Sequence, residues 1–340
     1  MSRLNRSLPG NGAKAAKTLC ALLTLMSVVV SGITFGLDKN MIHIGVIKIV
    51  SHEALDADEK GFEAALASSG FKEGDNVTYD RRNAQGDMTT ANAIAQQFVD
   101  QKVDLIHSIA TPTTQAVVKN TKNIPVVFSS VTDPVSAEIV AKDSAPGKKT
   151  GTNVTGVSDL WPVYLQMELY AKIVPKAKKW GTIYNPSESN SVMHIKAMRD
   201  AAKKLGLELI EATISSGKEV AQAASSLADK VKAIAIAADN TAVSEFNAIV
   251  TVCNEKKVPL FAGFVEGVSR GAIAAYGLDY YLVGYSAGKK AALVLKGMKP
   301  GDIPWGPAEK FSLVINEKAA KTQGVTVGPE ILKKADKVLR

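Results

Sequence analysis

The stretch VDLIHSIATP (residues 103–112), followed after a helical segment by KNIPVVFSSV (122–131), decides the fold, because VKAIAIAADN (231–240) and KKVPLFAGFV (256–265) repeat its pattern. Each copy runs from an apolar strand into polar residues and a helix, and then into a second strand. This strand–helix–strand alternation is typical of βαβ units and a parallel sheet. The echo indicates duplication and predicts two α/β lobes of similar construction.

The same alternation extends along the chain from Met41. A stretch over residues 146–153 separates two series of elements and is interpreted as a crossing between lobes. At 340 residues the chain exceeds the size of most single cores, which also favours two lobes, each a doubly wound α/β sheet. The expected strands cover residues 42–49, 77–84, 104–110 and 124–131 in the first series, and 179–186, 207–214, 232–239 and 258–264 in the second, with helices between them, one of them from 243 to 256.

The first 36 residues differ in composition from the rest and predict a secretory signal peptide over residues 1–36. Basic residues precede an uncharged run from Thr18 to Leu37, and small residues near Gly32 and Gly36 end its apolar part. An uncleaved transmembrane anchor is the alternative that the length of this run permits. Cys20 opens the apolar run instead of following it, so we do not expect a lipoprotein. The leader favours export to the periplasm.

The charge balance argues against nucleic-acid binding. The chain has 41 Lys and Arg against 33 Asp and Glu, but four of the basic residues lie in the leader, which leaves 37 against 33. No dense Lys/Arg cluster follows, and aromatic residues make up only 6% of the chain. Beyond the leader, Cys253 is the only cysteine in the sequence, so neither an intrachain disulfide nor a CxxC metal site is expected.

Motifs of the common enzyme classes are incomplete in this sequence. GYSAG (284–288) matches the Gly-x-Ser-x-Gly turn of hydrolases, but all four histidines precede it, whereas the hydrolase order places the histidine after the serine. We interpret GYSAG as a glycine-flanked helix start that packs closely on the sheet. No Gly-x-Gly-x-x-Gly turn follows a strand, no phosphate-binding loop occurs, and the histidines form no His-Glu-x-x-His pair. We expect no catalytic residue, no cofactor and no metal.

Polar residues gather where the predicted strands end. Taken singly, each is explained at least as well by helix capping or a turn as by ligand contact. Taken together they favour a binding site in a common cleft, because ligands of open α/β sheets lie beyond the carboxyl ends of the strands. The candidate ligand-binding residues are Glu53, Thr111, Thr113, Ser129, Ser130, Asp133, Ser158, Asp159, Asn185, Glu188, Asn190, Ser191, Asp239, Asn240 and Asp279.

Several longer segments share a recognisable order and spacing. They include IGVIKIVSHEALDADEKGFEAAL (44–66), IATPTTQAV (109–117), IPVVFSSVTDPVSA (124–137), GTNVTGVSDL (151–160), YNPSESNS (184–191) and GLDYYLVGYSAGKKAALVLKG (277–297). In order, and over nearly all of residues 42–336, these segments resemble the substrate-binding proteins of ABC transporters related to the tryptophan/tyrosine uptake type. The resemblance implies a type I periplasmic-binding fold, in which two Rossmann-like lobes joined by a hinge hold the ligand between them.

The resemblance also implies how the chain is divided and what it does. It places residues 41–157 plus 278–306 in an N-terminal lobe and residues 158–277 plus 307–340 in a C-terminal lobe. It implies a monomeric, extracytoplasmic component of an ABC importer that closes around a small solute, a hydrophobic or aromatic amino acid, and delivers it to a membrane permease. Two other functions stay open, an exported two-lobed hydrolase or lyase and the ligand-sensing lobe of a signalling system.

The two charges of an amino acid suit the candidate residues. Its carboxylate needs hydroxyls and backbone N–H groups at helix N-termini, which the turns at residues 109–113 and 129–134 can supply. Its ammonium needs a carboxylate partner. Asp239 is the first choice for that partner, and Glu188 and Asp159 are the alternatives.

Overall fold

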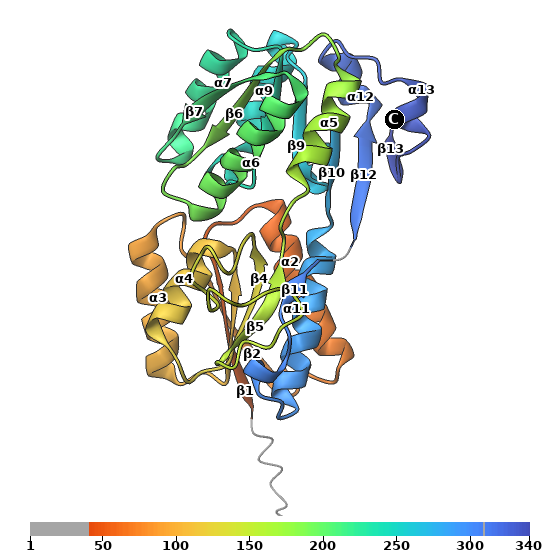
Figure 1. Ribbon diagram of the computed structural model, residues 1–340. Coiled ribbons are helices and arrows are strands. Elements are labelled where there is room, and N and C mark those ends of the chain that lie inside the picture. The colour runs from red at the N-terminus through yellow and green to blue at the C-terminus, as the bar shows by residue number, and fades with distance from the viewer. Residues whose placement is uncertain (1–40, 309) are drawn as a thin grey trace, which may run out of the picture. The chain divides into compact units, whose positions relative to one another are not determined.

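The structure, a computed structural model, describes residues 41–308 and 310–340 and arranges them as two α/β lobes, each built on one sheet (Figure 1). The predicted signal peptide lies outside the described residues. The first sheet has the strand order β11-β5-β4-β3-β1-β2, and the second has the order β13-β12-β10-β9-β8-β6-β7. We call the lobe around the first sheet the N-terminal lobe and the other the C-terminal lobe. The predicted fold class of two doubly wound α/β lobes is confirmed.

The N-terminal lobe is a parallel sheet with helices on both faces. Strands β3, β4 and β5 are buried along their whole length, which explains why their sequences do not alternate between apolar and polar residues. Helices α2 and α11 pack on each other at one face, and α3 and α4 pack together at the other. The elements are β1 (Ile42–Lys48), α2 (Glu53–Ser68), β2 (Val77–Asn83), α3 (Met88–Gln101), β3 (Leu105–Ile109), α4 (Thr111–Asn120), β4 (Val126–Val131), β5 (Val154–Ser158), α11 (Tyr280–Leu295), η2 (Pro300–Asp302) and β11 (Gly306–Pro307).

The C-terminal lobe repeats this arrangement. Helix α5 packs with α6, and α7 packs with α9, so that helices again cover the sheet. The elements are α5 (Val163–Ile173), β6 (Lys179–Tyr184), α6 (Ser189–Leu205), β7 (Glu208–Thr213), η1 (Gly217–Glu219), α7 (Val220–Ala228), β8 (Ala233–Ile236), α8 (Asn240–Ser244), α9 (Phe246–Lys256), β9 (Leu260–Phe264), α10 (Glu266–Arg270), β10 (Ala274–Leu278), β12 (Phe311–Asn316), α12 (Glu317–Thr322), α13 (Pro329–Leu332) and β13 (Lys337–Leu339).

Three segments carry the chain from one lobe to the other. Strand β5 of the first sheet leads into α5, which packs on β9 and β10 of the second. Strand β10 of the second sheet leads into α11, which packs on β4 and β5 of the first. Finally, β11 of the first sheet leads into β12 of the second (Figure 1). All three crossings therefore lie between the two sheets, where a ligand held by both lobes would also lie.

Some elements differ from the sequence-based expectation. Residues 146–153 do not cross between the lobes as interpreted from the sequence, because they join β4 to β5 and both strands belong to the first sheet. Residues 154–158, where no strand was expected, form β5, and the two-residue β11 pairs beside it. Strand β12 runs antiparallel to β10, whereas every other strand pair in the described residues is parallel. The single helix expected over residues 243–256 is two helices, because the chain leaves helical geometry at Glu245. Helix α8 has five residues and β11 has two, and segments of that length show no periodicity in the sequence.

Helices α2 and α11 touch backbone to backbone through glycines. A Cβ atom built on Gly284 would lie 1.8 Å from the carbonyl oxygen of Asp58, and one on Gly61 would lie 2.0 Å from that of Tyr281. Because α11 begins at Tyr280, GYSAG lies inside the helix and not at its start, which corrects the predicted position. The expected close packing is present, but it is against α2. In the described part of the chain, no helix is long and apolar enough to cross a membrane.

Candidate functional site

A cavity lies where the two lobes and two of the crossings meet. The centre of a water-sized molecule can reach only about 30 Å³ of it, so the cavity is narrow in this conformation, and part of it is open to solvent. The lining residues divide into a polar group and an apolar group of similar size, as an amphiphilic ligand requires. They are His52, Ala54, Leu55, Ser130, Thr132, Asp159, Trp161, Asn190, Ala238, Asp239, Asn240, Val243, Phe264 and Tyr280.

The N-terminus of α2 forms one wall. His52 is the N-cap residue, and its Nδ1 accepts a long hydrogen bond of 3.5 Å from the Leu55 N–H. Ala54 and Leu55, which line the cavity, belong to the first turn, where backbone N–H groups and the helix dipole favour a negative charge. Burial lowers the pKa of His52 to about 4, and its hydrogen bond to Asn240 of the other lobe does not offset this. His52 is therefore neutral at pH 7, and the positive character of this wall comes from the helix.

The end of β4 forms the next part of the wall. The pairing of β4 with β5 shifts by one residue between Phe128 and Val131, so β4 carries a bulge at this point. Within the bulge Ser130 has a φ of 54°, in the left-handed region that residues with a side chain seldom adopt. Ser130 and Thr132, on either side of Val131, both line the cavity.

Asp159 is a buried carboxylate with spare hydrogen-bonding capacity. It is 3% exposed. Its Oδ2 accepts a hydrogen bond of 2.6 Å from the Tyr280 hydroxyl, and its Oδ1 accepts one of 3.3 Å from Thr132 Oγ1. Burial raises its pKa, although both hydrogen bonds act in the opposite direction. In the described residues no Lys or Arg lies within ion-pair distance of it. A cation in the cavity would remove the cost of burying this charge.

Asp239 and Glu188 lie on the opposite side, but their oxygens are occupied. Asp239 accepts hydrogen bonds from the backbone N–H groups of Asn185 and Ala242, both at 2.6 Å, and from the Ser191 hydroxyl at 2.7 Å. Glu188 accepts from the backbone and side chain of Asn240 and of Thr241. Burial, followed by the charge of Glu188, raises the pKa of Asp239. Together these carboxylates hold the N-terminus of α8 in place.

Asn190 presents an acceptor without a partner. Its Nδ2 donates a hydrogen bond of 2.7 Å to the Ala238 carbonyl oxygen, which fixes the amide. Its Oδ1 is buried and has no hydrogen-bond partner among the described residues. A buried acceptor without a partner costs free energy unless a ligand or a water molecule supplies a donor. Because Asn190 lines the cavity, a donor on the ligand can fill this need.

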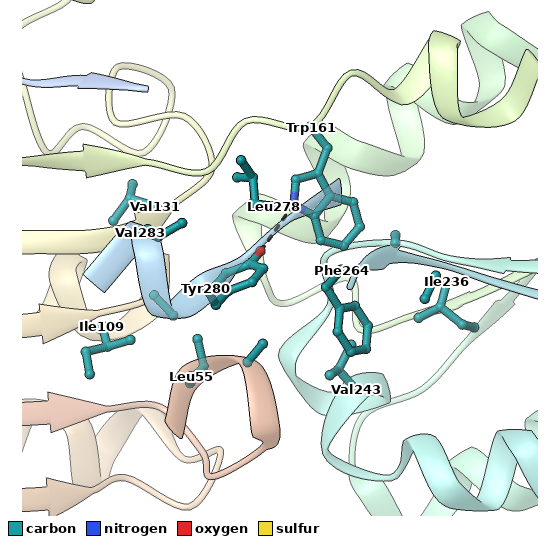
Figure 2. Packing of buried hydrophobic residues seen from close by; sticks show 14 of the residues in the cluster. Leu55, Ile109, Val131, Trp161, Ile236, Val243, Phe264, Leu278, Tyr280 and Val283 are labelled. Atoms are coloured by element: carbon teal, nitrogen blue, oxygen red, sulfur yellow. Dashed lines mark hydrogen bonds between the residues drawn. The ribbon is translucent and has the colours of Figure 1, made fainter. Parts of the chain in front are cut away.

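Aromatic side chains form the apolar wall, and a chain of hydrogen bonds ties two of them to Asp159. Trp161 Nε1 donates to the Tyr280 hydroxyl at 3.1 Å, and that hydroxyl donates to Asp159. Figure 2 shows Trp161 and Tyr280 meeting at this bond, with Phe264 on the other side of the Trp161 ring. A Cβ on Gly263 would lie 1.9 Å from Trp161 Cζ3, so the indole rests directly on the β9 backbone.

Two further contacts join the lobes beside the cavity. The Arg270 guanidinium of α10 lies 3.6 Å from a carboxylate oxygen of Glu53 at the start of α2. Glu266 Oε1 accepts a hydrogen bond of 3.1 Å from the Tyr280 N–H at the second crossing. Burial raises the pKa of Glu266 to about 7, and the charges of Asp279 and Glu53 add to the shift. The lobes are thus in contact on the side of α2 and α10.

Comparison with known proteins identifies the family. Residues 43–339 match the family described as ABC transporter substrate binding protein. The chain belongs to this family. It is therefore a substrate-binding protein of an ABC transporter, a transport component and not an enzyme, as the sequence predicts.

Three relatives of this substrate-binding protein show its place in the family. It is 42% identical over 283 residues to a tyrosine-binding protein of Clostridioides difficile, covering 83% of this chain and 81% of that one. A Streptococcus pneumonia ABC domain in complex with L-Trp superimposes with a TM-score of 0.82 at 36% identity, covering 88% and 100% of the two chains. A ligand-free, open substrate-binding protein with adhesive properties from Clostridium difficile, also 36% identical, gives a TM-score of only 0.64 over 88% and 99%.

The structure brings five of the candidate residues of this substrate-binding protein to the cavity and leaves ten out of its lining. Most of the ten form local hydrogen bonds. Thr113 donates to the carbonyl oxygens of Ile109 and Ala110, and Asp133 accepts from the backbone N–H of Val135 in a turn. Asp279 caps the N-terminus of α11. The five that line it are Ser130, Asp159, Asn190, Asp239 and Asn240, and the ten that do not are Glu53, Thr111, Thr113, Ser129, Asp133, Ser158, Asn185, Glu188, Ser191 and Asp279.

Other lining residues of the substrate-binding protein are absent from the sequence-based candidates. Leu55, Val243 and Phe264 are apolar and buried, so in the sequence they are indistinguishable from core residues. Tyr280 directly follows Asp279, a capping residue, and this position at a helix start was the one available signal. Trp161 follows the candidate residue Asp159 by two positions, and this proximity is the sequence signal that points to it.

Proposed function

We propose that this substrate-binding protein captures an aromatic amino acid, tryptophan or tyrosine, in the cavity between its lobes and delivers it to an ABC permease. The observation that carries the proposal is Asp159, a buried carboxylate with no cationic partner in the described residues, hydrogen-bonded to an aromatic wall. A ligand with an ammonium group next to an aromatic side chain satisfies both features at once. The tyrosine-binding and tryptophan-bound relatives support the same ligand class.

The ammonium of the ligand is assigned to Asp159, with Asn190 Oδ1 as a second acceptor. The sequence favoured Asp239 for this role. However, Asp239 already accepts three short hydrogen bonds within its own lobe, whereas Asp159 accepts one short and one long bond. A charge-assisted hydrogen bond is about twice as strong as a neutral one, so the carboxylate with free lone pairs is the better partner.

The carboxylate of the ligand is assigned to the N-terminus of α2 and to the hydroxyls of the β4 bulge. Ala54 and Leu55 supply the first turn of a 16-residue helix, and Ser130 and Thr132 stand beside it in the lining. Helix N-termini bind anions because their first N–H groups have no intrahelical acceptor. This places the carboxylate on the N-terminal lobe and leaves the side chain to the aromatic wall.

The side chain of the ligand is assigned to Trp161, Phe264 and Tyr280. Ring pairs with centroids roughly 4.5 to 7 Å apart contribute about 0.5 to 1.5 kcal/mol beyond area burial. Each of the three is at most 5% exposed, so the wall is sealed from solvent in this conformation. A planar apolar side chain fits such a wall, because aromatic rings pack on each other in offset or edge-to-face arrangements.

Gly263→Ala is expected to weaken binding of L-tryptophan at least tenfold. The added methyl would overlap the Trp161 ring, which must move and lose either its bond to Tyr280 or its place in the wall. Calorimetric titration measures the affinity, and tryptophan emission reports the ring movement. Gly328→Ala is the matched control, because a Cβ there meets nothing within 4 Å. Equal affinity in the Gly263 and Gly328 variants would remove Trp161 from the site.

Ligand binding is coupled to hinge closure in this proposal. The structure is more similar to the tryptophan-bound relative than to the open, ligand-free one at equal identity, and the aromatic wall of the cavity is buried. Both observations support a closed conformation. The lobes are proposed to consist of residues 41–157 plus 278–306 and of residues 158–277 plus 307–340, which agrees with the three crossings. A ligand that touches both lobes favours closure by its contacts with the second.

The location and partners follow from the family and the leader. The leader supports secretion through a signal peptide over residues 1–36, without a lipid anchor, into the periplasm. There the monomeric, ligand-loaded form would meet its permease. No covalent step and no cofactor belongs to this function.

The decisive experiment is a ligand screen on residues 37–340. Thermal shifts are measured with the twenty amino acids, sugars and nucleosides, followed by calorimetry and small-angle scattering on the hits. We expect L-tryptophan or L-tyrosine to raise the midpoint most, because ligand that binds only the folded state stabilises it, and to reduce the radius of gyration. A sugar or nucleoside as the best ligand, or turnover of any compound, would overturn the proposal.

A further inference from the structure

Two successive serines of β4 donate to one carboxylate beneath the cavity. Ser129 Oγ donates to Asp58 Oδ1 at 2.7 Å, and Ser130 Oγ donates to Asp58 Oδ2. In a regular strand, neighbouring side chains point to opposite faces, so both hydroxyls cannot reach one partner. They do so here because the strand is bulged and Ser130 has positive φ. The double hydrogen bond to Asp58 therefore depends on the bulge in β4.

Contacts within the N-terminal lobe fix the position of Asp58. It lies on α2 with no exposed surface, and its backbone carbonyl oxygen is pressed against Gly284 of α11. Ser129 Oγ also receives a hydrogen bond of 2.8 Å from His107 Nε2, whose ring stacks on Phe62 with centroids 3.7 Å apart. Burial lowers the pKa of His107 to about 3, so its ring is neutral. Because the Ser129 hydroxyl already donates to Asp58, Nε2 of His107 is assigned as the donor in the bond that they share. The acceptor is thus fixed by packing on several sides.

Asp58 does not line the cavity, but the residue that it restrains does. Ser130 and Thr132 contribute to the lining; Ser130 lies within the bulge and Thr132 follows it. For a residue with a Cβ, the left-handed conformation is less favourable than the usual regions, because the Cβ approaches the following carbonyl oxygen. Without an anchor for its hydroxyl, Ser130 would gain by returning to regular strand geometry, and the residues after it would change face.

We propose that Asp58 is a positioning residue for ligand binding: by accepting both serine hydroxyls it holds Ser130 in the left-handed conformation, so that the bulge directs Ser130 and Thr132 into the cavity. The inference rests on the proposed function, because it concerns the wall assigned to the ligand carboxylate. According to this inference, Asp58 influences the affinity for the ligand although it lies outside the cavity.

The test is a double-mutant cycle between Asp58→Asn and Ser130→Gly, with L-tryptophan and L-tyrosine as probes. Glycine adopts positive φ without strain, so in the Ser130→Gly background the bulge no longer needs Asp58. We expect Asp58→Asn to weaken binding at least tenfold in the wild-type background and less than twofold in the Ser130→Gly background. Affinities are measured by calorimetry well below the unfolding midpoint of each variant, because a merely structural role would change the midpoint only.

Ser108→Ala is the matched control. It removes another buried hydrogen bond of the same lobe, the one that Ser108 accepts from Thr114 at 3.0 Å, and Ser108 does not line the cavity. It is expected to lower the midpoint and leave affinity within twofold. If Asp58→Asn does not fold, Ser130→Ala and Ser130→Gly replace it: alanine loses the anchor and keeps the strain, so it should bind at least fivefold more weakly than glycine.

The outcomes separate the two proposals. If the wild type binds and Asp58→Asn weakens binding equally in both backgrounds, or not at all, the positioning role is overturned and the proposed function stands. Equal affinities of Ser130→Ala and Ser130→Gly overturn it in the same way. If the wild type binds neither amino acid, the proposed function fails and this inference fails with it.

Discussion

Asp159→Asn should reduce the affinity for an aromatic amino acid by a hundredfold or more. The substitution keeps the shape of the side chain and an acceptor for the Tyr280 hydroxyl, but it removes the negative charge assigned to the ligand ammonium. A hundredfold loss corresponds to about 2.8 kcal/mol, within the range for a buried charge-assisted contact. Calorimetric titration of L-tryptophan and L-tyrosine measures it directly.

Asp87→Asn is the control for charge alone. Asp87 caps α3, asparagine is an equally good cap, and the residue does not line the cavity. The control variant should bind like the wild type. If Asp159→Asn binds within threefold of the wild type, Asp159 is not the partner of the ligand ammonium. Asp239 would then be the next carboxylate to test.

Gly284→Val should destabilise the N-terminal lobe by more than about 3 kcal/mol. Overpacking a core with side-chain atoms costs typically about 1 to 3 kcal/mol, and here the new atoms meet backbone, which has no rotamer to change. The Cβ position lies 1.8 Å from the Asp58 carbonyl oxygen, so α11 must move off α2. Chemical denaturation followed by circular dichroism measures the free energy of unfolding.

Ser286→Val in the same helix is the matched control for the loss of helix propensity by a β-branched residue. Ser286 is exposed, and valine there should change stability by less than about 0.5 kcal/mol. If Gly284→Val were as stable as this control, the backbone contact between α2 and α11 would be absent in solution. Because Asp58 lies at this contact, a variant that does fold should also bind ligand more weakly.

The fold was predictable because short apolar strands alternate with amphipathic helical segments along most of the chain. The alternation between residues 42 and 264 gives the strands that form both sheets, and the echo of residues 103–131 in 231–265 indicates two similar lobes. The missed strands β5, β10, β11, β12 and β13 lie outside this alternation, next to the crossings or at the edge of the second sheet. Strand β11 has two residues, and no sequence pattern can mark a pairing of that length.

The candidate site was only partly predictable, because the same polar residue types cap helices and contact ligands. Strand-end reasoning found Asp159 and Asn190, but it selected Glu188 and Thr113 equally, and these satisfy local hydrogen bonds. Capping and ligand contact use the same side chains at the same positions, and only the remaining lone pairs distinguish them. The aromatic wall was missed for the opposite reason, since Phe264 is as apolar in sequence as any core residue.

The hydrogen bonds that Glu188 and Asp239 accept all come from the C-terminal lobe. In the proposed hinge motion this half of the receptor should therefore stay assembled when the lobes separate, so that the solute meets it first and the N-terminal lobe closes over it. Amide hydrogen exchange at Asn240, Thr241 and Ala242 should accordingly be equally slow with and without solute. Faster exchange in the empty receptor would show that the solute itself builds this surface.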